Sequence, residues 1–352
     1  MQVDFLIIGQ GISGTFLSWY LQKENKTFLV IDNNDKNSSS RIAAGIINPV
    51  TGRRMVKVWM GEEILPFVRE AYTEIGHALN IEVISQKSLI DFFPNPHQQQ
   101  VFTERVDEND EYLHTYPEQN QFNPFFNYEL GCGEIRHCYT AHLEILLPAW
   151  QQHLKTNRQL LEEDFEIEKL HISDTKVQYK DISAEKIIFC DGLKSFQNPY
   201  FSKLPFAPNK GEALSIEIPG LPGKHIYKKG FVLSPLSTDS LFWFGSNYQW
   251  KFDNTEPSKK FYEQAIRHLQ AWLKLSYTIH EHKAGLRPAT LERRPFVGFH
   301  PHQKNIAILN GMGSKGCSLA PFFAKQLTDH ILYSNAISPE ADIKRFSKIL
   351  AR

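Results

Sequence analysis

The stretch that decides the fold is Asp4-Phe5-Leu6-Ile7-Ile8-Gly9-Gln10-Gly11-Ile12-Ser13-Gly14, close to the start of the chain. An apolar run leads directly into a G-x-G-x-x-G sequence, and apolar residues at helical spacing follow it. A second apolar run, 27–31, ends on Asp32 at about the distance from Gly14 that a βαβ dinucleotide site requires. This order predicts a strand, a glycine turn, a helix and a second strand.

Each glycine of this turn has a physical task in such a site. Gly9 permits the tight turn, Gly11 lets the backbone approach a pyrophosphate, and Gly14 allows close packing of helix on strand. The helix N-terminus favours an anion, and Asp32 can accept hydrogen bonds from a ribose, which argues against NADP. The alternative is a glycine-tolerant strand–helix turn in another kind of α/β protein.

Length and charge limit the function classes. The chain has 352 residues, which suits two domains, and its 39 Lys and Arg balance 39 Asp and Glu. A net charge of zero gives no long-range attraction to nucleic acid or to an anionic membrane. We expect no membrane span and no signal peptide, since no apolar run is long enough and the first strand begins near residue 3.

The cysteines favour a cytoplasmic protein without a metal site. None of them has C-x-x-C spacing, and reduced, mostly buried thiols are expected; they are Cys132, Cys138, Cys190 and Cys317.

Apolar periodicity gives a coarse map of the rest of the chain. Helices are predicted over 62–78, 139–155 and 259–275, and strands over 187–192, 213–218, 230–234, 241–245 and 306–310. Residues 92–130 are rich in Gln, Asn, Pro and aromatic residues. We expect irregular structure there within a second domain, because the aromatic side chains need burial.

Two further features near the C-terminal end bear on chemistry. The turn Gly311-Met312-Gly313-Ser314-Lys315-Gly316 joins a strand to a helix. It is either an ordinary connection or a helix N-terminus that stabilises a group becoming negative during reaction, as reduced flavin does. Arg287 lies between Leu286 and Pro288, where a guanidinium needs an anionic partner. That partner is either a substrate carboxylate or an internal acid.

With these motifs in place, the chain resembles the FAD-dependent D-amino-acid oxidase family. The closest branch contains glycine oxidase, sarcosine oxidase and the oxidase half of a bacterial tRNA-modifying enzyme. The resemblance covers nearly the whole chain in order, and it rests on the first glycine turn with Asp32, on 43–46, 187–192, Lys210-Gly211-Glu212, Gly285-Leu286-Arg287-Pro288, Pro295-Phe296-Val297-Gly298 and the last glycine turn.

The resemblance implies an α/β fold, α+β overall. A Rossmann-type FAD-binding domain is expected from 1–80, 131–207 and 284–352, and a mainly antiparallel β substrate-binding domain from 81–130 and 208–283. The residues expected at FAD are Gly9, Gly11, Ile12, Ser13, Gly14, Asp32, Arg41, Ala44, Gly45, Ile46, Asp191, Gly192, Gly311, Gly313, Ser314, Lys315 and Gly316.

The implied reaction is oxidation of the C–N bond of a small amine that carries a carboxylate, an amino acid or an N-methyl amino acid. Hydride transfer to flavin N5 gives an imine, which water hydrolyses. Arg287 is expected to hold the carboxylate, and Tyr248 either supplies a hydroxyl or serves packing. The expected electron acceptor is oxygen or a quinone, and non-covalent flavin is the default.

Two alternatives stay open from the sequence. One is an oxidase acting on an aminomethyl side chain of a modified tRNA nucleoside, against which the zero net charge argues. The other is a flavin-binding module without turnover.

The chain also departs from glycine oxidase. Val232 stands where that enzyme has a tyrosine, and Ser314 where it has a second arginine, so glycine itself is not the expected substrate. Arg53 and Arg54 either widen the charged part of the site or, as we expect, are solvated or paired with acids.

Overall fold

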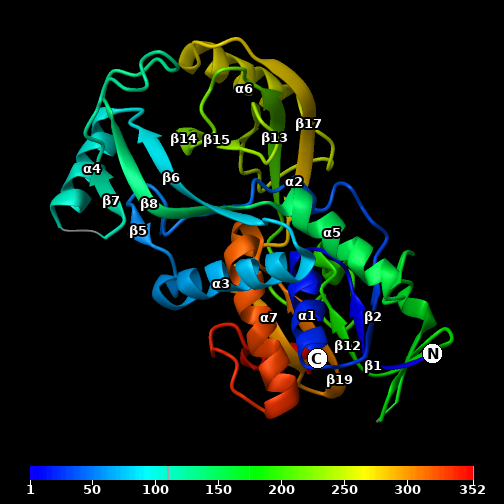
Figure 1. Ribbon diagram of the computed structural model, residues 1–352. Helices are drawn as coiled ribbons and strands as arrows, with labels where there is room; N and C mark the ends of the chain where they lie inside the picture. Colours follow the sequence, from blue (N-terminus) through cyan, green and yellow to red (C-terminus); the bar gives the residue numbers. More distant parts are fainter. Residues whose placement is uncertain (109–110, 174, 352) are drawn as a thin grey trace.

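The fold was analysed in a computed structural model that describes residues 1–108, 111–173 and 175–351. Two sheets dominate it (Figure 1). In that view both chain termini lie near the lower sheet, and a helix packs on the upper sheet. The expected combination of an α/β unit with a mainly antiparallel β unit is confirmed.

Four parallel strands form the centre of the first sheet. β1 (Gln2–Ile8) lies between β2 (Phe28–Ile31) and β12 (Ile182–Phe189), and β12 also pairs with β19 (Gln303–Asn310). Further strands complete the sheet: β9 (Leu160–Leu161), β10 (Leu170–Ile172), β11 (Val177–Tyr179) and β18 (Phe296–His300). Parallel pairing brings the carboxyl ends of the central strands to one edge of the sheet.

Both faces of this sheet are covered, which explains the continuous apolar runs. Ile7 belongs to the apolar cluster on one face and Leu6 to the cluster on the other, and both side chains are buried. Helices lie over the Ile7 face, namely α1 (Ile12–Lys23), α3 (Gly61–Leu79), α5 (Leu143–Thr156) and α7 (Gly316–Tyr333). The hydroxyl of Tyr72 on α3 donates to the carbonyl of Cys317 on α7 (3.1 Å).

The second sheet has the strand order β17-β13-β16-β15-β14-β6-β8-β3, with β7 beside β8. Its pairs are antiparallel apart from β14 with β6. The strands are β3 (Ile46–Ile47), β6 (Ile84–Phe92), β7 (Leu113–Thr115), β8 (Cys132–Ala141), β13 (Asn209–Glu217), β14 (His225–Lys229), β15 (Phe231–Pro235), β16 (Leu241–Gly245) and β17 (Thr278–Arg287). α6 (Lys259–Trp272) packs on one face, so its apolar side chains share a core with Leu214 and Leu233. The opposite face is turned toward the first sheet.

Short elements complete the fold. They are α2 (Ser39–Ile42), α4 (Pro96–Asp107), α8 (Ser347–Leu350), and the hairpin of β4 (Val50–Thr51) and β5 (Val56–Lys57).

The structure corrects the prediction for 139–155. The helix there begins only at Leu143, because Tyr139, Thr140 and Ala141 end strand β8. β8 also joins the second sheet, although 131–207 was expected in the first domain. Each of its faces contributes to a core, with Cys132 in one and Ile135 in the other, while Arg136 and His137 are exposed. The predicted helices over 62–78 and 259–275 are confirmed as α3 and α6.

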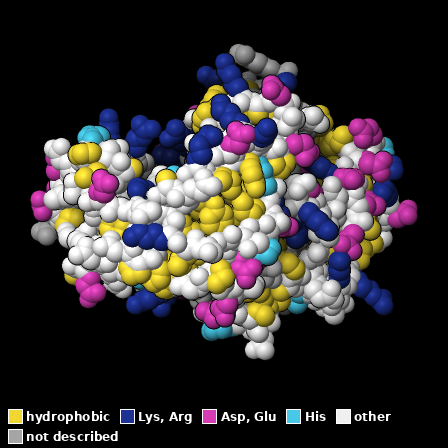
Figure 2. Space-filling view, turned by 90° about the horizontal axis from the view of Figure 1, so that it is seen from above, with side chains coloured by type: hydrophobic (Ala, Val, Ile, Leu, Met, Phe, Trp, Pro, Cys, Tyr) yellow, Lys and Arg dark blue, Asp and Glu magenta, His cyan; other side chains and the backbone are white. Residues whose placement is uncertain are grey.

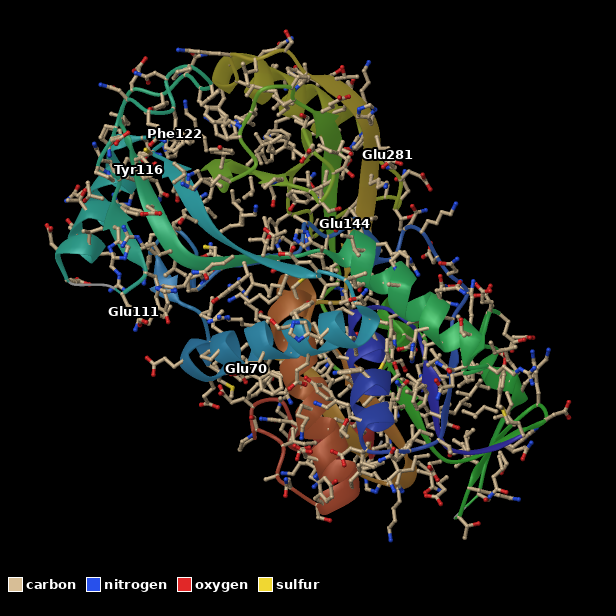
Figure 3. All side chains as sticks on the ribbon, viewed as in Figure 1. Glu70, Glu111, Tyr116, Phe122, Glu144 and Glu281 are labelled. Atoms are coloured by element: carbon tan, nitrogen blue, oxygen red, sulfur yellow. The ribbon has the colours of Figure 1, made fainter. Side chains whose placement is uncertain are left out.

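The prediction of irregular structure over 92–130 is wrong in part. The helix α4 lies there, and it begins where the side chain of Asn95 accepts a hydrogen bond from the backbone N–H of Gln98 (2.9 Å), with Pro96 in the first turn. Asn followed by Pro is a recognisable helix start. The expected burial of aromatic residues is confirmed for Phe122 and Phe126. Half-buried Tyr116 packs on Phe122 with ring centroids 5.1 Å apart (Figure 3).

The surface and the cysteines agree with the composition. On the face seen in Figure 2, Lys and Arg side chains are interspersed with Asp and Glu around an apolar middle. All four cysteines are buried and unpaired. In the described part of the chain, no helix combines the length and the apolar character that crossing a membrane requires.

Candidate functional site

The two glycine turns lie next to each other, as the sequence predicted. The first follows β1 and the second follows β19, and both strands end at the same edge of the first sheet. A methyl group placed on Gly316 would lie 3.4 Å from Cγ2 of Ile12, so α1 and α7 begin in contact (Figure 1). Residues from the two far ends of the chain are therefore neighbours in space.

Packing requires glycine at two positions of the first turn, Gly9 and Gly14, and Gly11 leaves open space beside them. Gly9 has a φ of +100°, and a side chain there would collide with the carbonyl of Cys190 at 2.6 Å. A Cβ on Gly14 would lie 1.9 Å from the carbonyl oxygen of Gly9, so the helix could not pack this closely on the turn. Gly11 faces Oγ of Ser40, which a Cβ would approach to 3.0 Å. The turn is a cradle that any larger residue would fill.

Asp32 lies beside this turn at the end of β2. Its Oδ2 accepts a hydrogen bond from the N–H of Gln10 (2.7 Å), and its Oδ1 accepts one from the N–H of Asn34 (2.8 Å). Each carboxylate oxygen has a second acceptor position, so the group can still bind hydroxyl donors. Arg41 also reaches the turn, because its Nη2 donates to the side chain of Gln10 (3.4 Å).

Two helices, α1 and α7, start at this edge. Neither has an acid in its first turn or a cap from the side chain of its own N-cap residue, although Oγ of Ser40 accepts from the N–H of Ile12 (3.1 Å). The positive ends of both helix dipoles and the remaining N–H groups of the first turns are therefore directed at this edge. Such an arrangement favours an anionic ligand.

A third strand end joins the two turns. Asp191 and Gly192 follow β12, and Nδ2 of Asn310 donates to the carbonyl of Gly192 and to Oγ of Ser195 (2.8 Å each). Oδ1 of Asn310 accepts from the N–H of Gly311 (2.7 Å). Burial raises the pKa of Asp191 to about 6. Asn310 was missed from the sequence, although a polar residue ending an apolar strand is a usable signal.

The loop 41–46 lies where the two sheets meet. Gly45 has a φ of +72°, and a Cβ there would lie 1.9 Å from the carbonyl of Ala141. Ile46 pairs with Thr140 in the second sheet, and Ala44 is buried. Nε1 of Trp243 donates to the carbonyl of Ile42 (2.8 Å), which fixes this segment to the second sheet as well.

The second glycine turn touches the strand that carries Arg287. The N–H of Gly313 donates to the carbonyl of Pro288 (3.1 Å). Lys315 is half-buried, and burial lowers its pKa, with Arg293 and Arg294 lowering it further. Ser314 is exposed.

Arg287 is partly buried and is held by uncharged groups. Its Nη1 donates to Oδ1 of Asn209 (2.7 Å) and to the carbonyl of Asn247 (3.4 Å), while its Nη2 donates to Oγ of Ser246 (2.7 Å). Within the described residues, no carboxylate forms an ion pair with this guanidinium. The internal salt bridge considered from the sequence is thus not found there. Burial lowers the pKa of Arg287.

Tyr248 contacts Arg287 through its ring. The ring centroid lies 4.5 Å from Cζ of Arg287, and 59% of Tyr248 is exposed. Val232 pairs with Gly245 in the same sheet and packs against the core below that sheet. Arg53 and Arg54 are exposed on a turn.

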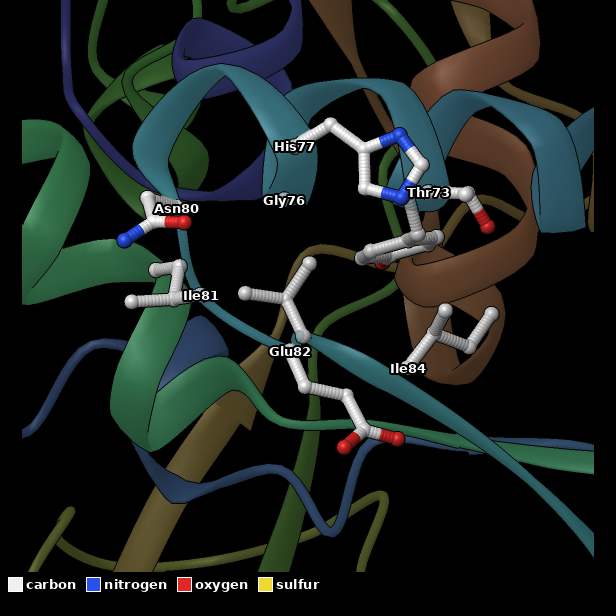
Figure 4. Close-up of a pocket in the computed structure, with 9 residues that line it drawn as sticks. Thr73, Gly76, His77, Asn80, Ile81, Glu82 and Ile84 are labelled. Atoms are coloured by element: carbon white, nitrogen blue, oxygen red, sulfur yellow. The ribbon is translucent and has the colours of Figure 1, made fainter.

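A pocket elsewhere contains none of the predicted site residues. It has a volume of about 700 Å³ and lies between the end of α3 and the start of β6, with Tyr72, His77, Asn80 and Glu82 in its lining (Figure 4). For the residues with described positions, no group of three or more His, Cys, Asp or Glu is arranged to hold a metal ion.

Comparisons with known proteins agree with this geometry. A family model described as FAD dependent oxidoreductase (DAO) matches residues 4–330. Iminodiacetate oxidase from Chelativorans sp. BNC1 has a similar structure, with a TM-score of 0.79, 18% identity and 98% of each chain covered. Glycine oxidase from Geobacillus kaustophilus has a TM-score of 0.76 at 14% identity, again with 98% of each chain covered. L-proline dehydrogenase from P. horikoshii has a TM-score of 0.74 at 15% identity, covering 99% of this chain and 98% of that chain. At these identities the structures share the fold.

Proposed function

This chain belongs to the DAO family of FAD-dependent oxidoreductases, and from that premise we propose that it oxidises the C–N bond of a small amine carrying a carboxylate. An amino acid or an N-methyl amino acid fits this description. The structurally similar proteins named iminodiacetate oxidase and glycine oxidase support this choice of substrate class, because iminodiacetate and glycine are both amines that carry a carboxylate.

The residues of the glycine turns fit FAD. The cradle at Gly9, Gly11 and Gly14 suits a pyrophosphate on the N-terminus of α1, and Asp32 suits a ribose. The other residues proposed to hold FAD are Ile12, Ser13, Arg41, Ala44, Gly45, Ile46, Asp191, Gly192, Gly311, Gly313, Ser314, Lys315 and Gly316. Bound FAD supplies the two-electron redox chemistry.

We assign these residues to an FAD-binding domain of 1–80, 142–207 and 284–352. The substrate-binding domain in this proposal comprises 81–141 and 208–283, because β8 pairs within the second sheet. Glu144, at the start of α5, links the two parts through a hydrogen bond from the N–H of Ser237 to its Oε1 (3.1 Å; Figure 3).

The observation that carries the substrate proposal is the set of groups that surround Arg287. Its guanidinium is partly buried, and its described partners are all neutral. A buried cation without an anion is costly, and a carboxylate ligand would remove that cost by forming charge-assisted hydrogen bonds. Asn209 adds to this argument, because its buried Nδ2 has no acceptor among the described residues.

The position of Arg287 links substrate binding to the cofactor residues. Pro288 follows it directly and accepts the hydrogen bond from Gly313. A carboxylate held by Arg287 is therefore placed beside the second glycine turn, and its amine is oriented relative to that turn. The ring of Tyr248 covers one face of the guanidinium, which leaves fewer directions for a ligand to approach. These residues contribute orientation and electrostatics.

The test is anaerobic mixing of the holoenzyme with D-amino acids, N-methyl amino acids and iminodiacetate, while the visible flavin bands are recorded. Bleaching by one or more of these amines is expected. A protein that stays oxidised with all of them, yet is reduced by dithionite, would contradict the proposal. Reoxidation of the bleached enzyme by air or by a soluble quinone then identifies the electron acceptor, for which we propose one of the two.

We propose the cytoplasm as the location of the enzyme, because its unpaired cysteines stay reduced there.

A further inference from the structure

A buried acid lies next to the Arg287 cluster without touching the guanidinium. Glu212 on β13 has no exposed surface, and its carboxylate has four hydrogen-bond donors. Oε1 accepts from Oγ of Ser258 (2.7 Å) and Nδ2 of Asn247 (3.3 Å). Oε2 accepts from the N–H of Ser258 (2.6 Å) and faces Nε2 of His282 (3.0 Å). A buried carboxylate with this many partners is fixed in place.

Asn247 connects this carboxylate to the substrate side. Its Oδ1 accepts from the backbone N–H of Glu212 (2.7 Å), so the two residues are joined twice. Its own carbonyl accepts from Arg287, and its neighbours Ser246 and Tyr248 contact the same guanidinium. The loop 246–248 is thus fixed on one side by Glu212 and presents three groups to Arg287 on the other.

The charge of Glu212 is already balanced locally. Nζ of Lys210, which is 3% exposed, lies 3.9 Å from Oε1, and it also donates to the carbonyl of Glu256. His282 adds a second polar partner from β17. Lys210 thus lies beside the Glu212 carboxylate, and the guanidinium of Arg287 keeps its neutral partners.

We propose that Glu212 is a positioning residue, which sets the 246–248 loop so that Arg287 is aligned for a carboxylate ligand. This inference rests on the proposed function, because it assumes that Arg287 binds the substrate carboxylate.

The substitution Glu212→Gln tests the inference with little change in shape. In one orientation the new NH₂ group faces the N–H of Ser258, and in the other it faces Nδ2 of Asn247, so one donor meets another donor either way. The second variant, Asn247→Ala, removes only the link from Glu212 to the loop. The matched control is Glu217→Gln on the same strand, since Glu217 pairs with His280 of β17 at 3.0 Å but is only half-buried.

The experiment measures binding of benzoate and glycolate to the holoenzymes by calorimetry, together with FAD affinity and Tm. We expect Glu212→Gln and Asn247→Ala to weaken carboxylate binding on the order of tenfold while FAD affinity stays close to wild type. Both variants should also melt at a lower Tm, because each leaves buried hydrogen-bonding groups without a partner. A general structural defect would weaken FAD binding together with carboxylate binding. Glu217→Gln is expected to bind like wild type.

Two results would overturn the inference, and only the second also overturns the proposed function. In the first, Arg287→Ala abolishes carboxylate binding, but Asn247→Ala and a folded Glu212→Gln bind like wild type. Glu212 then has no positioning role, and the proposed function is unaffected. If Glu212→Gln does not retain FAD, Asn247→Ala alone decides. If the wild type binds neither probe, or Arg287→Ala binds them equally well, the carboxylate site itself is wrong and the inference falls with it.

Discussion

Gly211 and Arg287 lie on neighbouring strands, and the guanidinium occupies the space that a side chain at position 211 would need. A Cβ on Gly211 would lie 2.0 Å from Nη2 and 2.3 Å from Cζ of Arg287. Gly211 pairs with Gly285 across β13 and β17, two residues from the pair of Asn209 with Arg287. The absence of a side chain at 211 therefore allows Arg287 to cross β13 and reach Ser246.

Gly211→Ala should displace Arg287 without disturbing the cofactor residues. Because the added methyl group overlaps the guanidinium, we expect benzoate affinity to fall about 10- to 100-fold while FAD stays bound. Calorimetry and the visible spectrum measure the two effects. Gly223→Ala is the control, since its Cβ would meet Pro235 at an ordinary 3.6 Å. If Gly211→Ala binds benzoate with wild-type affinity, Arg287 does not need the space beside residue 211 to bind the carboxylate.

Arg287→Ala should raise KM for the amine found in the anaerobic panel by about 100-fold, because paired charge-assisted hydrogen bonds are lost. Arg287→Lys should recover only part of this, since an ammonium lacks the planar fork. Steady-state kinetics and flavin content are the measurements, with the exposed Arg267→Ala as control. If Arg287→Ala has an unchanged KM, the carboxylate does not bind at this residue.

Gly11→Ala and Gly14→Ala should separate cofactor binding from folding. The Gly14 substitution overlaps backbone at 1.9 Å, so we expect a loss of about 2–4 kcal/mol of unfolding free energy as well as loss of FAD. The Gly11 methyl group meets only the Ser40 hydroxyl at 3.0 Å. Its apoprotein should melt near the wild-type Tm, yet bind FAD weakly. Tight FAD binding by Gly11→Ala would show that the pyrophosphate does not bind at this turn.

Asp191 should make the stability depend on pH in a defined window. Burial raises its pKa from 3.8 to about 6, so between these values the folded protein binds the proton more tightly than the unfolded chain. Relative to Asp191→Asn, the wild-type protein should therefore gain stability as the pH falls from about 6 toward about 4. We expect the Tm difference between the two proteins to change by about 2–4 °C. Parallel Tm curves would show that the carboxyl is not perturbed in the folded state.

The sequence by itself determined the parts of this protein that depend on neighbouring residues. The first glycine turn, the strand ending on Asp32 and the helix 62–78 follow from local backbone geometry and apolar period, and the structure contains them as β1, β2, α1 and α3. The start of α4 was equally local, since Asn95 and Pro96 mark it, and it was overlooked.

Only the tertiary structure decided how Arg287 is partnered and to which sheet β8 belongs. An arginine in an apolar stretch has the same local pattern whether its partner is an internal acid or a ligand. The neutral groups around Arg287 come from β13 and from the loop after β16, remote in the chain. Likewise β8 has buried residues on both faces, so local periodicity does not decide its sheet, and pairing with β6 places it in the second. Side-chain partners and strand neighbours are contacts between distant segments, which local periodicity does not encode.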